Sequence, residues 1–421
     1  MLTKAPKGTR DILPGETSKW QYFERVVSKL AENYGFNELR VPIFEHTDLF
    51  ARGVGESTDI VTKQMYTFED KAARSITLRP EGTASTVRAF IEYKMFNQPQ
   101  PVKMYYLGPM FRYENPQAGR YRQFHQFGVE YFGSIAPEAD VETIQLCINI
   151  FKELGLKNLS LEINSVGCPN CRQKFQEELK KYLANNLDEL CKDCRSRYET
   201  NPMRILDCKN KKCNDLLKDD MPLLLDNLCS ECDEHFYNVK ELLTYVGLDF
   251  EVNPKMVRGL DYYTKTAFEV IVDDIGAQSS IGGGGRYDGL VKECGGPETP
   301  AVGFAVGIER VLLALENQGV KIPEDNEADA YLVYGGSEAK KECFRMLDKI
   351  RSLGYLALMD FEDKSFRAQL KKADKLNAKY AVIIGEEELS EEHVLLRNMK
   401  DGNQEKIPMN SFLDKIQELI R

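Results

Sequence analysis

The chain has 421 residues, of which 42% are hydrophobic and 29% are charged, and its formal net charge is −10. These values are typical of a soluble globular protein, and the length predicts two or three domains. The N-terminal segment has no apolar signal-peptide core, and no stretch approaches the ~18 apolar residues of a membrane span. We therefore expect a cytoplasmic protein without a membrane partner. The acidic charge argues against a non-specific nucleic-acid coat protein but allows a local basic surface.

The N-terminal region predicts a long helix followed by an interrupted strand. Over residues 17–35, apolar side chains recur three and four positions apart, and Gly35 ends the pattern. Residues 36–50 have the composition of a strand, but Pro42 removes one backbone donor from it. We expect this strand at an edge or a bend of a sheet.

Residues 75–90 predict a short strand, a tight turn and a helix. Glu81 stands in the turn, where an acidic side chain favours the first turn of the helix that follows. Capping of that helix and contact with a ligand are the two interpretations of Glu81.

Two strands joined by a polar turn are predicted for residues 103–114 and 122–133. Side chains two apart share one face of a strand, so Arg112 and Glu114 point together. A sheet face with guanidinium and carboxylate groups is poorly suited to a hydrophobic core. The hairpin is either an edge with solvated charges or a floor for an anionic ligand that also carries a cation.

Eight of the eleven cysteines lie in a helical segment that resembles an insertion into the strand-rich pattern, and we assign it to residues 168–240. They are Cys168, Cys171, Cys191, Cys194, Cys208, Cys213, Cys229 and Cys232. Taken in sequence order, the first four and the last four both have the spacing of a tetrahedral zinc site. Interleaved pairing is equally compatible with the spacing, and reduced thiols without metal are the alternative.

Strand-rich sequence returns between residues 255 and 303. Four consecutive glycines, residues 282–285, let the backbone approach a ligand or a neighbouring strand, and the ending of a P-loop is missing. A strand at 301–307 then leads into a helix. Arg310 lies in the first turn of that helix, where a cation opposes the helix dipole. This placement makes sense if Arg310 faces a phosphate.

A polar linker, residues 319–328, precedes a change of pattern. Strands then alternate with helices, which predicts a small α/β domain with a largely parallel sheet. One predicted helix carries a basic stripe, either a solvated face or a nucleic-acid contact. The stripe consists of Lys364, Arg367, Lys371 and Lys375.

Four segments are similar, in their order along the chain, to motifs of class II aminoacyl-tRNA synthetases and specifically of histidyl-tRNA synthetases. They are the hairpin, RGLDYYTK from Arg258, GGGGRYDG from Gly282, and AVGFAVGIER from Ala301. The resemblance covers nearly the whole chain and implies an α+β fold, with an antiparallel sheet flanked by helices. The catalytic domain would span residues 1–325, interrupted by the insertion, and an anticodon-binding α/β domain would span 328–421.

The resemblance implies a two-step ligation of L-histidine to its tRNA. Histidine and ATP, with Mg²⁺, form histidyl-adenylate and pyrophosphate, and the histidyl group then passes to the tRNA 3′ end. The N-terminal helix and strand resemble the dimerisation motif of the family, so we expect a homodimer. Because the resemblance says nothing about zinc, that prediction depends on the cysteine spacing alone.

The resemblance also implies residue roles. Arg112, Arg258 and Arg310 would be catalytic, and Arg112, Glu114 and Arg310 would bind ATP. The histidine site would comprise Glu81, Gly82, Thr83, Gln126, Glu130, Tyr262, Tyr263 and Tyr287. Gln117 and Arg120 would meet the tRNA acceptor end, whereas Asn115 departs from the arginine common in relatives. None of the four histidines is expected to be catalytic, although His125 lies within the hairpin.

Two other classes of protein share parts of this pattern. The regulatory subunit of ATP phosphoribosyltransferase senses histidine without forming an adenylate, but it lacks the anticodon domain and tends to lose catalytic residues. Synthetases for threonine or proline have similar C-terminal domains, but the RGLDYY segment and Glu130 argue against them. For the insertion we predict a clamp on the tRNA acceptor arm, because it follows the hairpin.

Overall fold

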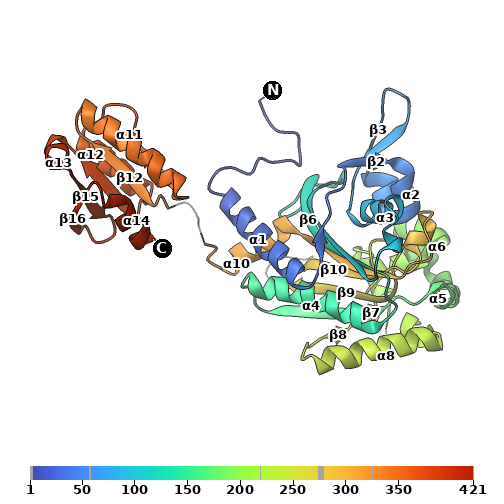
Figure 1. Ribbon diagram of the computed structural model, residues 1–421. Coiled ribbons are helices and arrows are strands. Elements are labelled where there is room, and N and C mark those ends of the chain that lie inside the picture. The colour runs from blue at the N-terminus through green and yellow to red at the C-terminus, as the bar shows by residue number, and fades with distance from the viewer. Residues whose placement is uncertain (1–2, 56–57, 219, 274–278, 324–326, 421) are drawn as a thin grey trace. The chain divides into compact units, whose positions relative to one another are not determined.

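This computed structural model describes residues 3–55, 58–218, 220–273, 279–323 and 327–420. The chain divides into two units, one built chiefly of residues 20–321 and the other of residues 322–421. Each unit is organised around its own β-sheet (Figure 1). Among the described residues, no helix has both the length and the apolar character needed to cross a membrane.

An eight-stranded sheet forms the centre of the first unit, in the order β1-β5-β6-β11-β10-β9-β7-β8. Its strands are β1 (Asn37–Glu38), β5 (Val102–Phe111), β6 (Gln123–Phe132), β7 (Leu159–Ser165), β8 (Glu251–Val252), β9 (Thr264–Val272), β10 (Ser280–Arg286) and β11 (Ala301–Gly307). Neighbouring strands are antiparallel except for β1 with β5 and β7 with β8, the short pairings at the two edges. The antiparallel sheet expected from the sequence is confirmed.

The segment predicted as one strand over residues 36–50 is divided. It forms β1, then β2 (Phe44–His46), then α2 (Thr47–Val54), and Pro42 lies in the break. The side chain of Arg79 donates to the Val41 carbonyl at 3.0 Å, so a guanidinium holds backbone that has left the sheet ladder. β2 instead joins a three-stranded sheet with β4 (Ser75–Leu78) and β3 (Tyr66–Glu69).

Helices flank both faces of the large sheet. Besides α2, the helices of this unit outside the insertion are α1 (Thr17–Asn33), α3 (Thr83–Glu92), α4 (Pro137–Glu153), α9 (Leu290–Glu293) and α10 (Ile308–Asn317), with short helical segments η1 (Ile60–Gln64) and η2 (Met95–Asn97). A side chain at Gly282 of β10 would meet Phe151 of α4, whereas one at Gly283 would meet Arg258. Because neighbouring residues of a strand face opposite ways, α4 and Arg258 lie on opposite faces of the sheet.

The insertion is helical throughout its described residues. Its elements are α5 (Pro169–Leu183), η3 (Ala184–Glu189), α6 (Lys192–Thr200), η4 (Pro202–Ile205), α7 (Lys211–Asp215), η5 (Leu224–Asn227) and α8 (Ser230–Tyr245). Cysteines 168, 191 and 229 each stand at the N-cap of a helix. All eight cysteines of the insertion either belong to the buried cluster that contains Leu179 and Leu190 or pack against it.

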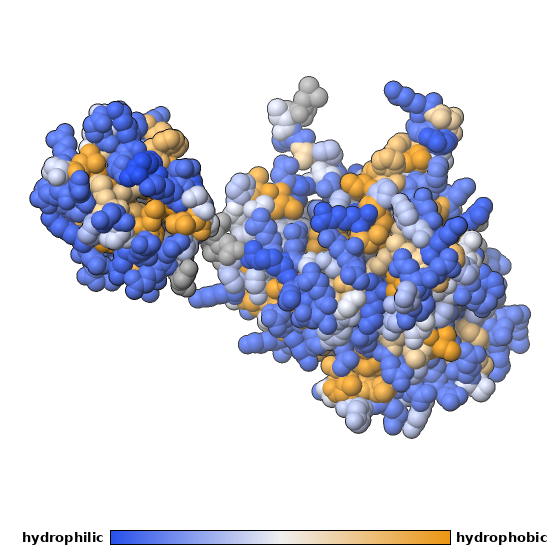
Figure 2. Space-filling view, viewed as in Figure 1, coloured by the Kyte–Doolittle hydropathy of each residue, from blue (hydrophilic) through white to orange (hydrophobic). Residues whose placement is uncertain are grey.

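The second unit has a five-stranded sheet in the order β13-β12-β14-β15-β16. Its elements are β12 (Ala330–Tyr334), α11 (Ser337–Ser352), β13 (Ala357–Met359), α12 (Phe366–Lys375), β14 (Tyr380–Ile384), α13 (Glu386–Ser390), β15 (His393–Asn398), β16 (Gln404–Pro408) and α14 (Phe412–Ile420). Strands β13, β12 and β14 are parallel, and β15 and β16 add antiparallel partners. Hydrophilic residues cover most of the visible face of either unit (Figure 2).

Candidate active site

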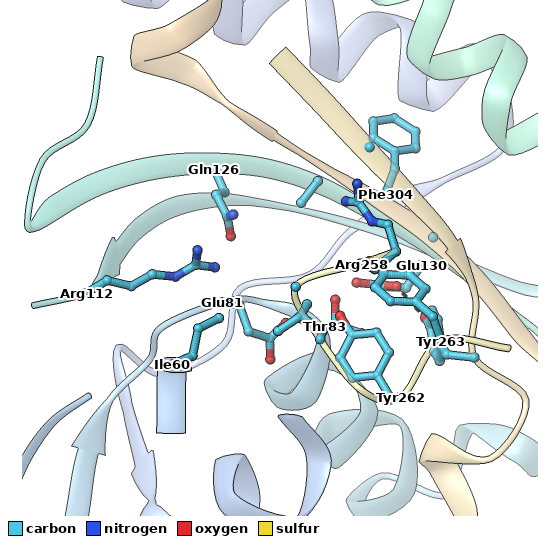
Figure 3. Close-up of a pocket in the computed structure, with 16 residues that line it drawn as sticks. Ile60, Glu81, Thr83, Arg112, Gln126, Glu130, Arg258, Tyr262, Tyr263 and Phe304 are labelled. Carbon is cyan, nitrogen blue, oxygen red and sulfur yellow. Dashed lines mark hydrogen bonds between the residues drawn. The ribbon is translucent and has the colours of Figure 1, made fainter. Parts of the chain in front are cut away.

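A polar cavity opens on the face of the large sheet opposite α4. Small residues of two neighbouring strands form part of its floor, because Gly283 and Ala305 pair with each other and both line the cavity. A Cβ at Gly283 would lie 2.7 Å from the Phe268 carbonyl oxygen and 3.0 Å from Arg258 Nη1. Glycine at this position therefore lets the Arg258 side chain lie directly against the strand, at the centre of the cavity (Figure 3).

One end of the cavity surrounds a buried carboxyl group with tyrosines. Glu130 is 1% exposed, and the Tyr287 hydroxyl donates to its Oε2. The Tyr262 ring lies 4.7 Å from the Tyr263 ring and 5.6 Å from the Tyr287 ring, between centroids. Burial raises the pKa of Glu130 to about 8, although hydrogen bonds from Thr83 and Tyr287 act in the opposite direction. This end can therefore discriminate between ligands by whether they place a hydrogen-bond donor beside Glu130.

Glu81 caps α3 and also lines the cavity. Its Oε2 accepts from the Thr83 backbone N–H at 2.7 Å and its Oε1 accepts from the Ala84 N–H at 2.9 Å, so it caps α3. The same carboxyl group lines the cavity, and burial raises its pKa. Opposite, the Gln126 side chain extends from β6, and its Oε1 is a buried acceptor with no donor among the described residues (Figure 3). A ligand with N–H groups would satisfy it.

The other end of the cavity is rich in arginine and continues into a second hollow. Arg112, Gln126 and Arg258 line both hollows. Arg112 Nε donates to the Pro80 carbonyl at 2.8 Å, and its guanidinium lies 5.2 Å from the centre of the Phe124 ring. Two anchored sets of donors thus point toward the shared space, the arrangement that binds an anion.

Arg310, in the first turn of α10, lies in this second hollow. Its Nε donates to the Ser280 carbonyl at 2.9 Å. Burial and, after it, the nearby positive charge of Arg120 lower the pKa of Arg310 to about 10. The side chain therefore remains protonated at pH 7, and a negative ligand would relieve the repulsion between the two arginines.

Most residues predicted for the site come together in these two hollows. Gly82 and Gln117 are the predicted residues that line neither of them. Gly82 is the buried N-cap residue of α3. Gln117 pairs through its backbone with Arg120 in the turn of the hairpin, and Arg120 reaches back to Glu114 with Nη1 3.4 Å from Oε2. Arg120 was predicted for the tRNA end and also lines the arginine-rich hollow.

Sequence reasoning missed three residues of the site. Phe124 and Glu269 line the arginine-rich hollow, and Glu269 is the ion-pair partner of Arg258. A charge in the middle of the apolar strand TAFEVIV was the available signal. Glu309 accepts from the backbone N–H of His125 at 3.0 Å and lies 3.0 Å from its Nδ1. His125 therefore links β6 to α10.

Comparison with known proteins places these features in one family. A family model described as histidyl-tRNA synthetase matches residues 8–311, and a model described as anticodon binding domain matches residues 329–419. The chain is 56% identical over 419 residues to a histidine–tRNA ligase of Natranaerobius thermophilus, with 100% of both chains covered. This chain belongs to the histidyl-tRNA synthetase family. A ligase of Caldanaerobacter subterraneus is 53% identical over 421 residues, again with 100% of both covered.

The apo histidyl-tRNA synthetase of S. aureus has the same fold. Its crystal structure matches with a TM-score of 0.85 and 41% identity, covering 98% of this chain and 99% of that one. The predicted family and fold class are confirmed, with an antiparallel-rich sheet flanked by helices and an anticodon-binding domain at the C-terminal end.

The eight cysteines of the insertion form two groups, but not in sequence order. Cys168 and Cys171 join Cys229 and Cys232, and these enclose a second group, Cys191, Cys194, Cys208 and Cys213. The sequence left the grouping open, and the structure differs from the grouping of the first four with one another and the last four with one another: the two pairs at the ends of the insertion come together, and the four cysteines between them form the other group. We call these groups the outer cluster and the inner cluster. Within each cluster the sulfur atoms lie within 4.8 Å of one another.

Proposed function

We propose that this chain ligates L-histidine to its tRNA through histidyl-adenylate. The observation that carries the proposal is the continuous cavity with two unlike ends. One end has carboxyl and hydroxyl groups for a small cationic and aromatic amino acid, and the other has arginines for a polyphosphate. Arg258 lies where the two ends meet, which is where the amino-acid carboxylate and the α-phosphate must react.

Histidine binds at the tyrosine-rich end. Glu81, Thr83 and Gln126 take the α-ammonium group, and Glu130 with Tyr263 and Tyr287 takes the imidazole ring. A site whose buried carboxyl group needs an N–H partner rejects isosteres that lack one, because the group would be left unpaired. The raised pKa of Glu130 lets this residue and the imidazole share one proton near neutral pH.

ATP binds at the arginine-rich end. Arg112 contacts the α-phosphate, Arg310 the γ-phosphate, and the ring of Phe124 offers a flat surface to the base. The histidine carboxylate attacks the α-phosphorus and pyrophosphate leaves. The nucleophile is already ionised at pH 7, so the residues mainly position the reactants and stabilise charge. Mg²⁺ neutralises further phosphate charge, and the carboxylate of Glu114 is a ligand of the type it prefers.

The tRNA extends from this cavity to the second unit. Gln117 and Arg120, in the hairpin turn, meet the acceptor end. In the second unit, Arg367, Lys371 and Lys375 are exposed on α12 and contact the anticodon arm. Lys364 precedes that helix and pairs with Glu362, so it contributes less to the stripe than its spacing suggests. We further propose that the protein works in the cytoplasm as a homodimer.

The two cysteine clusters would each hold one structural zinc ion through four thiolates. Neighbouring sulfur atoms are 3.5 Å apart for Cys168 and Cys171 and 3.9 Å apart for Cys191 and Cys208. A tetrahedral ion with zinc–sulfur bonds of about 2.3 Å requires separations of about 3.8 Å. Backbone N–H groups also point at the sulfurs, such as Cys229 N at 3.1 Å from Cys171 Sγ. Elemental analysis of untagged protein is expected to find about two zinc ions per chain, and a value below one contradicts the two-site proposal.

ATP–pyrophosphate exchange without tRNA tests the proposed activity. Each of the twenty amino acids is assayed separately, and exchange is expected with histidine alone. Exchange with threonine or proline instead would show that the chain activates an amino acid other than histidine. Histidine binding without exchange for any amino acid would favour a regulatory protein that senses histidine.

A further inference from the structure

The segment 258–263, which carries the tyrosine pair, separates two cavities. On one side it lines the histidine end of the active site. On the other side it lines a smaller hollow whose opposite wall belongs to the insertion. Arg258, Leu260 and Tyr263 border both hollows. We call residues 258–263 the tyrosine loop. Because the loop lies against the insertion, its conformation depends on the side chains of the insertion that contact it.

Arg204 of the insertion binds the tyrosine loop most extensively. Its Nε and Nη2 both lie 3.0 Å from Oδ1 of Asp261, and Nη2 also donates to the Gly259 carbonyl at 2.8 Å. Asn201 adds a donor to the same Oδ1 at 3.0 Å. The Arg204 side chain is 11% exposed, so solvent screens this ion pair little.

Each contact starts next to a cysteine cluster. Arg204 lies in η4, between Cys194 and Cys208 of the inner cluster. Arg172 directly follows Cys171 of the outer cluster, and its Nη1 donates to the carbonyls of Asp261 at 3.1 Å and Tyr263 at 3.2 Å. If the cysteines hold their backbone in place, both arginines are restrained on the insertion side.

The phosphate-binding arginines are anchored elsewhere. Arg112 holds the Pro80 carbonyl and Arg310 holds the Ser280 carbonyl, and neither acceptor belongs to the insertion. A substitution in the insertion should thus affect histidine binding more than ATP binding. This asymmetry separates a positioning effect from general loss of structure.

We propose that Arg204 and Arg172 are positioning residues for histidine. They hold the tyrosine loop in the conformation that places Tyr262 and Tyr263 in the cavity, and metal in the two clusters holds the arginines. The inference rests on the proposed function, because it takes the tyrosine-rich end as the histidine site. It gives the insertion a role in amino-acid binding that does not involve tRNA.

The test compares two arginine-to-methionine variants in histidine-dependent pyrophosphate exchange. Arg204→Met retains the aliphatic stem and removes the donors to Asp261. Arg195→Met, at an exposed arginine on α6 of the same insertion, is the matched control. Loss of hydrogen bonds to a charged group predicts a KM for histidine that rises on the order of tenfold in Arg204→Met. The KM for ATP is expected to stay within about twofold of wild type.

Arg204→Lys keeps one charged donor and is expected to restore part of the histidine affinity. It also replaces Arg204→Met if that variant fails to fold. Equal KM values for histidine in the Arg204 and Arg195 variants would overturn the proposal. So would parallel increases in the KM values for histidine and ATP, because they would indicate a general structural defect.

Metal removal tests the second half of the proposal. Wild-type protein treated with a zinc chelator is expected to show a raised KM for histidine, and chelation should add less to Arg204→Met than to wild type. If chelation raised the KM for histidine by the same factor in Arg204→Met and in wild type, the metal would not act through Arg204, and this half of the proposal would be overturned. Failure of the proposed function has a different signature, namely no histidine-dependent exchange in untreated wild-type protein.

Discussion

The two sheets of this protein use their faces in opposite ways. In the second unit, hydrophobic clusters cover both faces, with α11 and α14 on one side and α12 on the other, and all five residues of β12 are buried. In the first unit, α4 seals one face, and the other carries Glu130, Gln126 and Glu269 among glycines. Buried polar atoms that lack a partner among the described residues, such as Oε1 of Gln126 and Oε1 of Glu130, therefore distinguish the face suited to a ligand from a face sealed by packing.

The largest expected effect is on the charged face of the first sheet. Arg258→Met removes the cation at the junction of the two hollows, and pyrophosphate exchange should fall about a thousandfold in kcat/KM. Arg258→Lys retains a charge and should lose less. A decrease of less than tenfold in Arg258→Met would show that the reacting groups meet elsewhere.

The opposite result is expected for a residue of the second sheet. Leu332 is fully buried in β12, so Leu332→Ala should lower the free energy of unfolding of its unit by about 3 kcal/mol. Denaturant unfolding measures this change. Histidine-dependent exchange without tRNA should stay at the wild-type rate, and a parallel loss of exchange would contradict the separation of roles between the sheets.

Glu130→Gln should weaken function and improve stability together. The kcat/KM for histidine is expected to fall on the order of thirtyfold, because the amide cannot share a proton with imidazole. The raised pKa of Glu130, about 8, means that the folded protein keeps a proton that the unfolded chain releases above its ordinary pKa of about 4.3.

The contribution of Glu130 to wild-type stability should therefore decline as pH rises from about 4.3 to about 8. Glu130→Gln lacks this contribution, so its thermal midpoint should gain on that of wild type as pH rises within this window. Melting both proteins at pH 5, 6.5 and 8 measures the difference. A constant difference across the three values would mean that Glu130 does not hold the proton.

The smallest effect is expected on the surface of the second unit. Changing Arg367, Lys371 and Lys375 together to glutamine should weaken tRNA binding about tenfold and flatten its dependence on salt concentration. Exchange without tRNA should not change. Unaltered tRNA affinity at two salt concentrations would assign the stripe to a solvated helix face.

Short-range patterns carried most of what the sequence predicted. The hairpin formed by β5 and β6 and the strand–turn–helix around Glu81 depend on residues close together in the chain, so alternation and turn residues were sufficient. The side-chain contacts of Arg204 with Asp261 and of Glu309 with His125 join residues far apart. Local sequence patterns cannot predict such long-range contacts.

Two further misses have simple physical causes. Strand β16 has the burial pattern of an exposed edge, with Ile407 as its one buried residue, so it lacks the apolar alternation that marks a strand. The cysteine spacing indicated two groups of four thiols, which the structure shows, but spacing within each pair says nothing about which pairs meet. Helix packing over the whole insertion decides that.

The nesting of the cysteine clusters also fixes the order in which they are completed during synthesis. The ribosome releases the chain from the N-terminus, so all four inner cysteines have emerged once Cys213 has left the exit tunnel. The outer cluster waits for Cys229 and Cys232, with its first two cysteines already present. The cysteines of the insertion thus become available from the inner cluster outward, and the last of them emerges before the tyrosine loop does.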